Sequence, residues 1–152
     1  MLRAVAVAAA GALVVVGGVT GFGRWQDARS TDCRHRSVVL AGLPLLAEQP
    51  PGVLRGDTYS GCDADRLVAY AGRQYHGEAD EPAVLSFYRA AAERDAWRVT
   101  EAAPAPSDPG GAGLCGSRRL DGDTVYVSLS FPAPDVFELH VADSPDSGPA
   151  RC

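Results

Sequence analysis

The sequence predicts an α+β protein: an N-terminal transmembrane helix, then one helix packed on a mostly antiparallel four- to five-stranded sheet. Three observations predict this fold. Residues 4–23 form an uncharged apolar stretch, an amphipathic helical stripe follows Asp80, and alternating apolar and polar residues recur after Trp97. A strand, a helix and then a run of strands indicate one helix that covers one face of an antiparallel meander.

The apolar stretch at residues 4–23 is long enough to cross a membrane. At 1.5 Å per residue, about 20 residues span a hydrocarbon core of roughly 30 Å. The aromatic ring of Trp25 follows at headgroup level. The alternative is a signal peptide that is cleaved near Val19-Thr20-Gly21, which would release a secreted protein. The chain then divides into four predicted parts: an anchor (1–25), a juxtamembrane helix with a Pro-rich linker (26–56), the α+β domain (57–143) and a tail (144–152).

Arginine and cysteine give opposite predictions of orientation. Only Arg3 precedes the apolar stretch, whereas four arginines follow it within residues 24–36, a bias that by the positive-inside rule would keep the domain in the cytoplasm. All four cysteines follow the stretch, without a C-x-x-C pair, as expected of structural disulfides in an oxidising compartment. We give the cysteines more weight, because whole domains translocate despite flanking charge. The expected localisation is a single-pass membrane protein with an extracytoplasmic C-terminal domain.

Disulfide pairing is open on sequence grounds, since four cysteines allow three pairings. The favoured pairing joins Cys33 to Cys62 and Cys115 to Cys152, because each bridge would tie a terminal segment to the sheet. We expect all four to be structural.

Before the domain's main helix, the sequence predicts a short helix and one strand. Ser30-Thr31-Asp32 can cap a helix that carries leucines and valines over 38–46 and ends or kinks near Gly42 and Pro44. Residues 66–75 are typical of a strand, with a bulge at Gly72. Asp80 then caps a helix over 81–94, in which Pro82 occupies the tolerated first turn.

After that helix the chain alternates as strands do. Residues 97–100 and 114–120 form two strands, and Asp121-Gly122 is a strong hairpin turn signal. In the next two strands the apolar residues point to the core. The other face, expected to be wet, carries five polar residues that could form a shallow recognition surface: Tyr126, Ser128, Ser130, Glu138 and His140.

No cofactor, metal site or catalytic residue is predicted. The formal charge of −5 argues against nucleic-acid binding. Lys, Ile and Asn are absent, a pattern typical of a GC-rich genome, so the arginines indicate no particular ligand. Asp57, Asp63 and Asp65 could hold a cation, but turn and capping roles are favoured. His35, His76 and His140 lack the spacing of metal ligands.

Several of these segments together resemble a family. In three segments the chain resembles small uncharacterised membrane-anchored proteins of actinobacteria. These segments are the run Tyr59 to Asp63, the Phe-Tyr-bearing helix over 84–94 that leads to Trp97, and the Leu-Cys strand with its D-G hairpin and C-terminal Cys. The helix in those proteins is often followed by Gly-Trp, where this chain has Ala96. The resemblance implies an exported α+β domain and transfers no functional residue, because the relatives have no assigned activity.

The sequence thus predicts a non-enzymatic, membrane-anchored module that binds or accompanies an envelope protein or a cell-wall component. Two alternatives remain open. One is an exported hydrolase whose site is assembled from scattered residues, such as His140 with Glu138 or Asp63. The other is an inhibitor-like module, because small disulfide-braced domains present rigid protein-binding surfaces.

Overall fold

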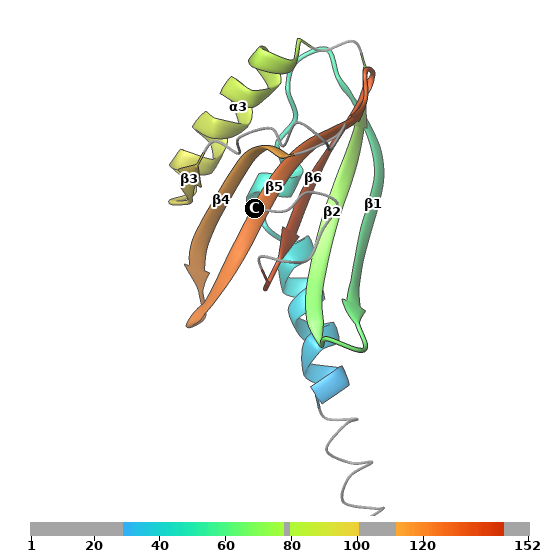
Figure 1. The fold of residues 1–152 in the computed structure, drawn as a ribbon, viewed down its shortest axis with the longest axis vertical. Coiled ribbons are helices and arrows are strands. Elements are labelled where there is room, and N and C mark those ends of the chain that lie inside the picture. The colour runs from blue at the N-terminus through green and yellow to red at the C-terminus, as the bar shows by residue number, and fades with distance from the viewer. Residues whose placement is uncertain (1–28, 78–79, 101–111, 145–152) are drawn as a thin grey trace, which may run out of the picture. The chain divides into compact units, whose positions relative to one another are not determined.

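The computed structural model describes residues 29–77, 80–100 and 112–144, and the chain divides into two compact units, residues 1–32 and 33–152. Figure 1 shows the fold. The predicted anchor at residues 4–23 lies outside the described residues. Within the described ranges, no helix combines the length and apolar character needed to span a membrane.

The domain is built on one antiparallel sheet of six strands, so the prediction of four to five strands was too low. In spatial order the strands are β1-β2-β6-β5-β4-β3, an order that Figure 1 makes visible across the sheet. Their bounds are β1 Leu54–Asp63, β2 Val68–His76, β3 Arg98–Thr100, β4 Ala112–Leu120, β5 Asp123–Ala133 and β6 Val136–Ala142.

The extra strand is β1, which precedes the helix together with β2. Its sequence contains Gly56 and Gly61 and lacks alternating apolar residues, so it carries no period-2 signal. It is an edge strand, and each of its residues is exposed or half-buried. The bulge expected at Gly72 is absent there, because pairing runs without a break from Thr58 to Asp63 of β1; the irregularity lies between Arg55 and Thr58.

Two of the predicted helices are confirmed, the juxtamembrane helix and the helix over 81–94, and the predicted membrane helix lies outside the described residues. The prediction that Ser30-Thr31-Asp32 cap the juxtamembrane helix was wrong, because these three residues lie inside it. A helix covers described residues 29–41 and ends at Gly42, before the short α2 (Pro44–Ala47). The long helix α3 (Glu81–Arg94) starts where expected, because the Asp80 carboxylate accepts a hydrogen bond from the backbone N–H of Ala83 at 3.3 Å.

All helices contribute to a core on one face of the sheet. Alternate residues of β5 and β6, among them Leu129 and Phe137, point into it, as predicted. The rings of Tyr75 and Phe137 stack with centroids 4.9 Å apart. The hydroxyls of Tyr75 and Tyr88 both donate to the carbonyl oxygen of Glu48, at 2.8 and 3.2 Å. These bonds hold the segment after α2 against the core.

The β4–β5 turn is the predicted two-residue hairpin. Asp121 and Gly122 both have positive φ, +51° and +98°, as a type I′ turn requires. This turn fixes the register of β4 on β5.

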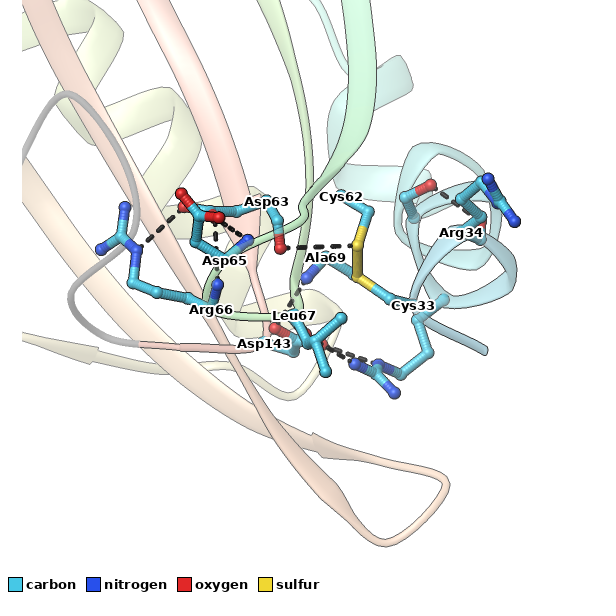
Figure 2. Close-up of a disulfide and its surroundings, with 11 residues drawn as sticks. Cys33, Arg34, Cys62, Asp63, Asp65, Arg66, Leu67, Ala69 and Asp143 are labelled. Carbon is cyan, nitrogen blue, oxygen red and sulfur yellow. Dashed lines mark hydrogen bonds and ion pairs between the residues drawn. A yellow bond between two sulfur atoms is a disulfide. The ribbon is translucent and has the colours of Figure 1, made fainter. Parts of the chain in front are cut away.

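A disulfide joins the first helix to the end of β1. Cys33 and Cys62 are bonded with their Cα atoms 5.8 Å apart, which confirms that half of the favoured pairing (Figure 2). The sulfur of Cys33 is fully buried. No cysteine in the described part of the chain is free. Cys152, the expected partner of Cys115, lies outside the described residues, so the second bridge stays a prediction.

Close to this bridge, Asp143 connects three parts of the domain. Its carboxylate accepts from the backbone N–H of Ala69 at 3.0 Å and from Nε of Arg36 at 2.7 Å. Arg36 also donates to the carbonyl oxygen of Leu67 at 3.0 Å. The first helix, the start of β2 and the end of β6 therefore meet at one end of the sheet, where the chain enters the domain.

Candidate functional site

Strand parity places a second set of side chains on the face of the sheet away from the core. Because successive residues of a strand point to opposite faces, the neighbours of each core residue lie here. We call this surface the polar face and define it by seven residues of four strands: Tyr59, Tyr70, Gln74, Ser128, Ser130, Glu138 and His140.

One row of directly paired residues crosses all six strands on this face. In spatial order from β1 to β3 its members are Tyr59, Gly72, His140, Ser128, Cys115 and Thr100. Paired residues in neighbouring strands have their Cβ atoms about 5 Å apart. Gly72 is the one member of the row without a side chain, and it separates Tyr59 from His140.

The missing side chain lets Tyr59 reach across β2. A Cβ atom at Gly72 would lie 2.3 Å from Cζ and Oη of Tyr59 and 2.9 Å from the carbonyl oxygen of Leu139. The same relation occurs at the next position, where a Cβ at Gly61 would lie 2.7 Å from Oη of Tyr70. Each tyrosine thus covers a glycine of the neighbouring strand, an arrangement that protects otherwise bare backbone.

The hydroxyl of Tyr59 connects two side chains of β6. It donates a hydrogen bond to Oε1 of Glu138 and lies 2.9 Å from Nδ1 of His140. A phenol has only one proton, so Nδ1 of His140 must be the donor to Oη when that proton points to Glu138. The amide of Gln74 donates to the other carboxylate oxygen of Glu138 at 3.4 Å.

The electrostatics of the cluster keep Tyr59 neutral. Burial raises the pKa of the Tyr59 phenol above its usual value, and the hydrogen bond and negative charge of Glu138 raise the pKa further. A phenolate beside that carboxylate would be strongly disfavoured. Tyr59 therefore acts as a hydrogen-bond donor that orients Glu138, and a nucleophilic role for its oxygen is disfavoured.

His140 packs against two tyrosine rings, which also contact each other with centroids 6.3 Å apart. Its ring centroid is 5.9 Å from that of Tyr59 and 6.1 Å from that of Tyr70, with interplanar angles of 30° and 21°. Only 6% of His140 is exposed, and Ser128 and Ser130 are also buried. The sequence placed these three residues on the correct face but wrongly expected them to be solvated, because larger neighbours in adjacent strands cover small or central side chains. Tyr59, Tyr70, Gln74 and Glu138 are half-buried, as is Tyr126.

The other candidate residues remain apart from this cluster. Asp63 closes the β1–β2 turn: its carboxylate accepts from the backbone N–H groups of Asp65 and Arg66 and from Nε of Arg66 at 2.9 Å. The backbone and side-chain bonds from Arg66 lower the pKa of Asp63. This is the turn role favoured by the sequence, and the described residues hold no group of acidic, His or Cys side chains arranged for a metal ion.

Tyr59, Tyr70 and Gln74 belong to the cluster although the sequence did not predict them as site residues. His35 and His76 are exposed and take no part in it. The signal that could have found Tyr59 is the presence of a glycine opposite an aromatic residue in a neighbouring strand, which requires knowledge of the register.

Comparison of the chain with protein families, curated proteins and solved structures gives no match.

Proposed function

We propose that this protein is a membrane-anchored, extracytoplasmic binding module of the cell envelope, and that the polar face of its sheet binds a hydroxyl-rich wall glycan. The observation that carries the proposal is the half-buried cluster in which Tyr59 orients Glu138 beside a second tyrosine, Tyr70. The activity that we propose is recognition without turnover.

The location is supported by two features of the chain. Residues 4–23 have the length and composition of a membrane anchor. Ten residues after Gly23, Cys33 forms its bridge to Cys62. Disulfides persist in oxidising compartments outside the cytoplasm, so this bridge supports export of the domain.

The choice of a glycan follows from the chemistry of the polar face. Tyrosine rings offer flat apolar surfaces with a polar edge, suited to a ligand that has apolar C–H faces and hydroxyl groups. The carboxylate of Glu138 accepts hydrogen bonds from hydroxyls, and the amide of Gln74 can donate and accept. Because Glu138 is already held by Tyr59 and Gln74, its orientation is fixed before a ligand arrives, which reduces the entropic cost of binding.

The test measures binding of soluble wall fragments to the full chain in phosphatidylcholine nanodiscs. We expect Tyr70→Leu and Glu138→Gln each to weaken binding about tenfold, since each removes a contact worth roughly 1–2 kcal/mol. Glu93→Gln is the matched control, because Glu93 is an exposed carboxylate on α3, which packs on the opposite face. Circular dichroism verifies that each variant is folded.

Two results would contradict the proposal. One is the absence of saturable binding to glycan fragments. The other is binding that Glu138→Gln and Glu93→Gln reduce equally, which would place the ligand elsewhere.

A hydrolase is the second candidate, and the contact between His140 and the Tyr59–Glu138 pair favours it. The hydrogen bonds connect His140 to Tyr59 and Tyr59 to Glu138. A histidine connected in this way to a carboxylate is a candidate for general acid–base catalysis. Against it, His140 is almost fully buried and its Nδ1 is engaged by Tyr59. Turnover of ester, amide or glycosidic envelope substrates by the wild type, lost in His140→Gln, would establish the hydrolase and exclude a purely binding role.

A further inference from the structure

Three arginines surround a hollow at the edge of the sheet, away from the polar-face cluster. The hollow has a volume of about 630 Å³ and is lined by Arg98, Arg118 and Arg119 together with Asp95, Ser117 and Thr124. It forms because β3 pairs with β4 only as far as Ser117, while β4 continues to Leu120. Past Ser117, in the part of the chain that the structure describes, β4 has a neighbouring strand on one side only.

Arg118 is held in place by contacts that leave its charge available. Its Nη1 donates to the carbonyl oxygen of Asp95 at 3.0 Å, and its guanidinium carbon lies 5.1 Å from the centre of the Trp97 ring. One hydrogen bond uses one of five N–H donors, and the ring fixes the plane of the group. The side chain is therefore oriented before any ligand binds.

The hollow carries an excess of positive charge. Arg98 and Arg119 are exposed, and Nη1 of Arg119 donates a hydrogen bond to Oγ1 of Thr124 at 3.5 Å. Among the described residues, none of the three arginines forms an ion pair. Against their three charges the lining contains one carboxylate, that of Asp95. This concentration of cations is notable in a protein whose formal charge is −5.

We propose that this hollow binds phosphate groups. Guanidinium groups match the oxygens of phosphate in geometry and form strong charge-assisted hydrogen bonds with them. The hydroxyls of Ser117 and Thr124 add neutral donors on the same lining. This is a second site that neither the glycan proposal nor the polar-face cluster requires.

A lipid headgroup is the source of phosphate that the proposed membrane anchor favours. Thr124 also lines a neighbouring hollow that includes Arg36 and Asp143, at the end of the sheet where the chain enters the domain. Residue 33 follows the predicted membrane segment by only ten residues. The proposed anchor would hold the domain at a phospholipid membrane, so the choice of a lipid as the source rests on the proposed function.

The experiment uses Trp97 as a reporter, in the full chain with Trp25→Phe, in maltoside micelles that contain no phosphate. Because Arg118 lies over Trp97, phosphate binding is expected to change the Trp97 emission in a saturable manner. One arm adds inorganic phosphate. The other adds short-chain phosphatidylglycerol, with a diacylglycerol of the same chain length, which lacks phosphate, as its control.

We expect both phosphate-containing probes to bind and the lipid to bind more tightly. The double variant Arg98→Gln/Arg119→Gln is expected to weaken both by about tenfold or more, because two charge-assisted contacts are lost. Arg55→Gln, at an exposed position on the opposite edge strand, is the matched control and should leave binding unchanged.

Three results would overturn the proposal in whole or in part. Absence of saturable binding, or equal effects of the Arg98/Arg119 and Arg55 variants, would refute a phosphate site. Binding of inorganic phosphate without phosphatidylglycerol would refute the lipid source. Each result is independent of glycan binding, which we expect Glu138→Gln to weaken and the arginine variants to leave unchanged.

Discussion

The hydroxyl of Tyr59 lies where the side chain of residue 72 would begin, 2.3 Å from the Cβ position that Gly72 leaves empty. This relationship brings a residue of β1 into contact with His140 and Glu138 of β6, although β2 lies between these strands. The polar-face cluster therefore depends on a glycine that itself makes no side-chain contact.

Gly72→Ala tests this dependence. The new methyl group would collide with the Tyr59 ring and with the Leu139 carbonyl, so we expect a loss of about 1–3 kcal/mol in the free energy of unfolding. In a Tyr59→Ala background the ring is absent, and Gly72→Ala should lower the free energy of unfolding by clearly less. Urea denaturation of the two single variants and the double variant gives this coupling energy. Additive effects would show that Tyr59 does not occupy the site.

Alkaline pH should destabilise the protein through two tyrosines. Burial raises the pKa values of Tyr59 and Tyr88 in the folded state, whereas an unfolded tyrosine has a pKa of about 10. Below pH 10 both states keep these protons, so the contribution to stability is complete. Above it the unfolded state loses its protons first, and the free energy of unfolding falls as pH rises.

Urea midpoints between pH 8 and 11.5 measure this effect. Tyr59→Phe and Tyr88→Phe should each flatten the alkaline decline, since neither variant can release the proton concerned. A decline as steep as that of the wild type in both variants would disprove the assignment.

Loss of the Cys33–Cys62 bridge should lower stability strongly. The two residues are 29 positions apart, and closure of such a loop contributes about 3–4 kcal/mol in the chain-entropy model. We expect reductant, or Cys33→Ser with Cys62→Ser, to lower the melting temperature by about 10 °C or more. A wild-type melting curve that reductant does not change would contradict this. Mass spectrometry of the unreduced chain after proteolysis checks the predicted Cys115–Cys152 bridge.

The contacts of Asp143 should contribute more to the free energy of unfolding than an exposed ion pair does. Asp143→Ala removes the acceptor of both Arg36 and the Ala69 N–H in a partly buried setting, and we expect a cost of about 1–3 kcal/mol. The control is Glu48→Gln, which breaks the exposed pair with Arg94 and should cost less than about 1 kcal/mol. Equal costs in chemical denaturation would show that Asp143 does not fasten this end of the sheet.

The elements that the sequence predicted correctly are those whose signals are local. Helix α3 has its cap at Asp80, and the β4–β5 hairpin has its turn at Asp121-Gly122. Both signals lie within a few residues of the structure that they specify. Strand β1 was missed because an edge strand needs no buried alternating residues, and its pairing with β2 is specified elsewhere in the chain.

The sequence predicted only part of the polar face, because only part of it follows from local alternation along a strand. Alternation along β5 and β6 correctly assigned Ser128 and His140 to the face opposite the core. Parity does not reveal whether neighbouring strands cover a side chain, and the burial of His140 by the Tyr59 and Tyr70 rings arises from residues some 70 to 80 positions away. The arginine hollow likewise depends on where β3 ends beside β4.

The most direct test of the proposed placement is labelling of an exposed cysteine on intact cells. Ser86 is exposed on α3, so Ser86→Cys provides a reporter thiol, and the wild type is the control for any labelling of the native cysteines. With a membrane-impermeant maleimide, an extracytoplasmic domain predicts equal labelling of Ser86→Cys in intact and lysed cells. Labelling that appears only after lysis would place the domain in the cytoplasm and contradict the account.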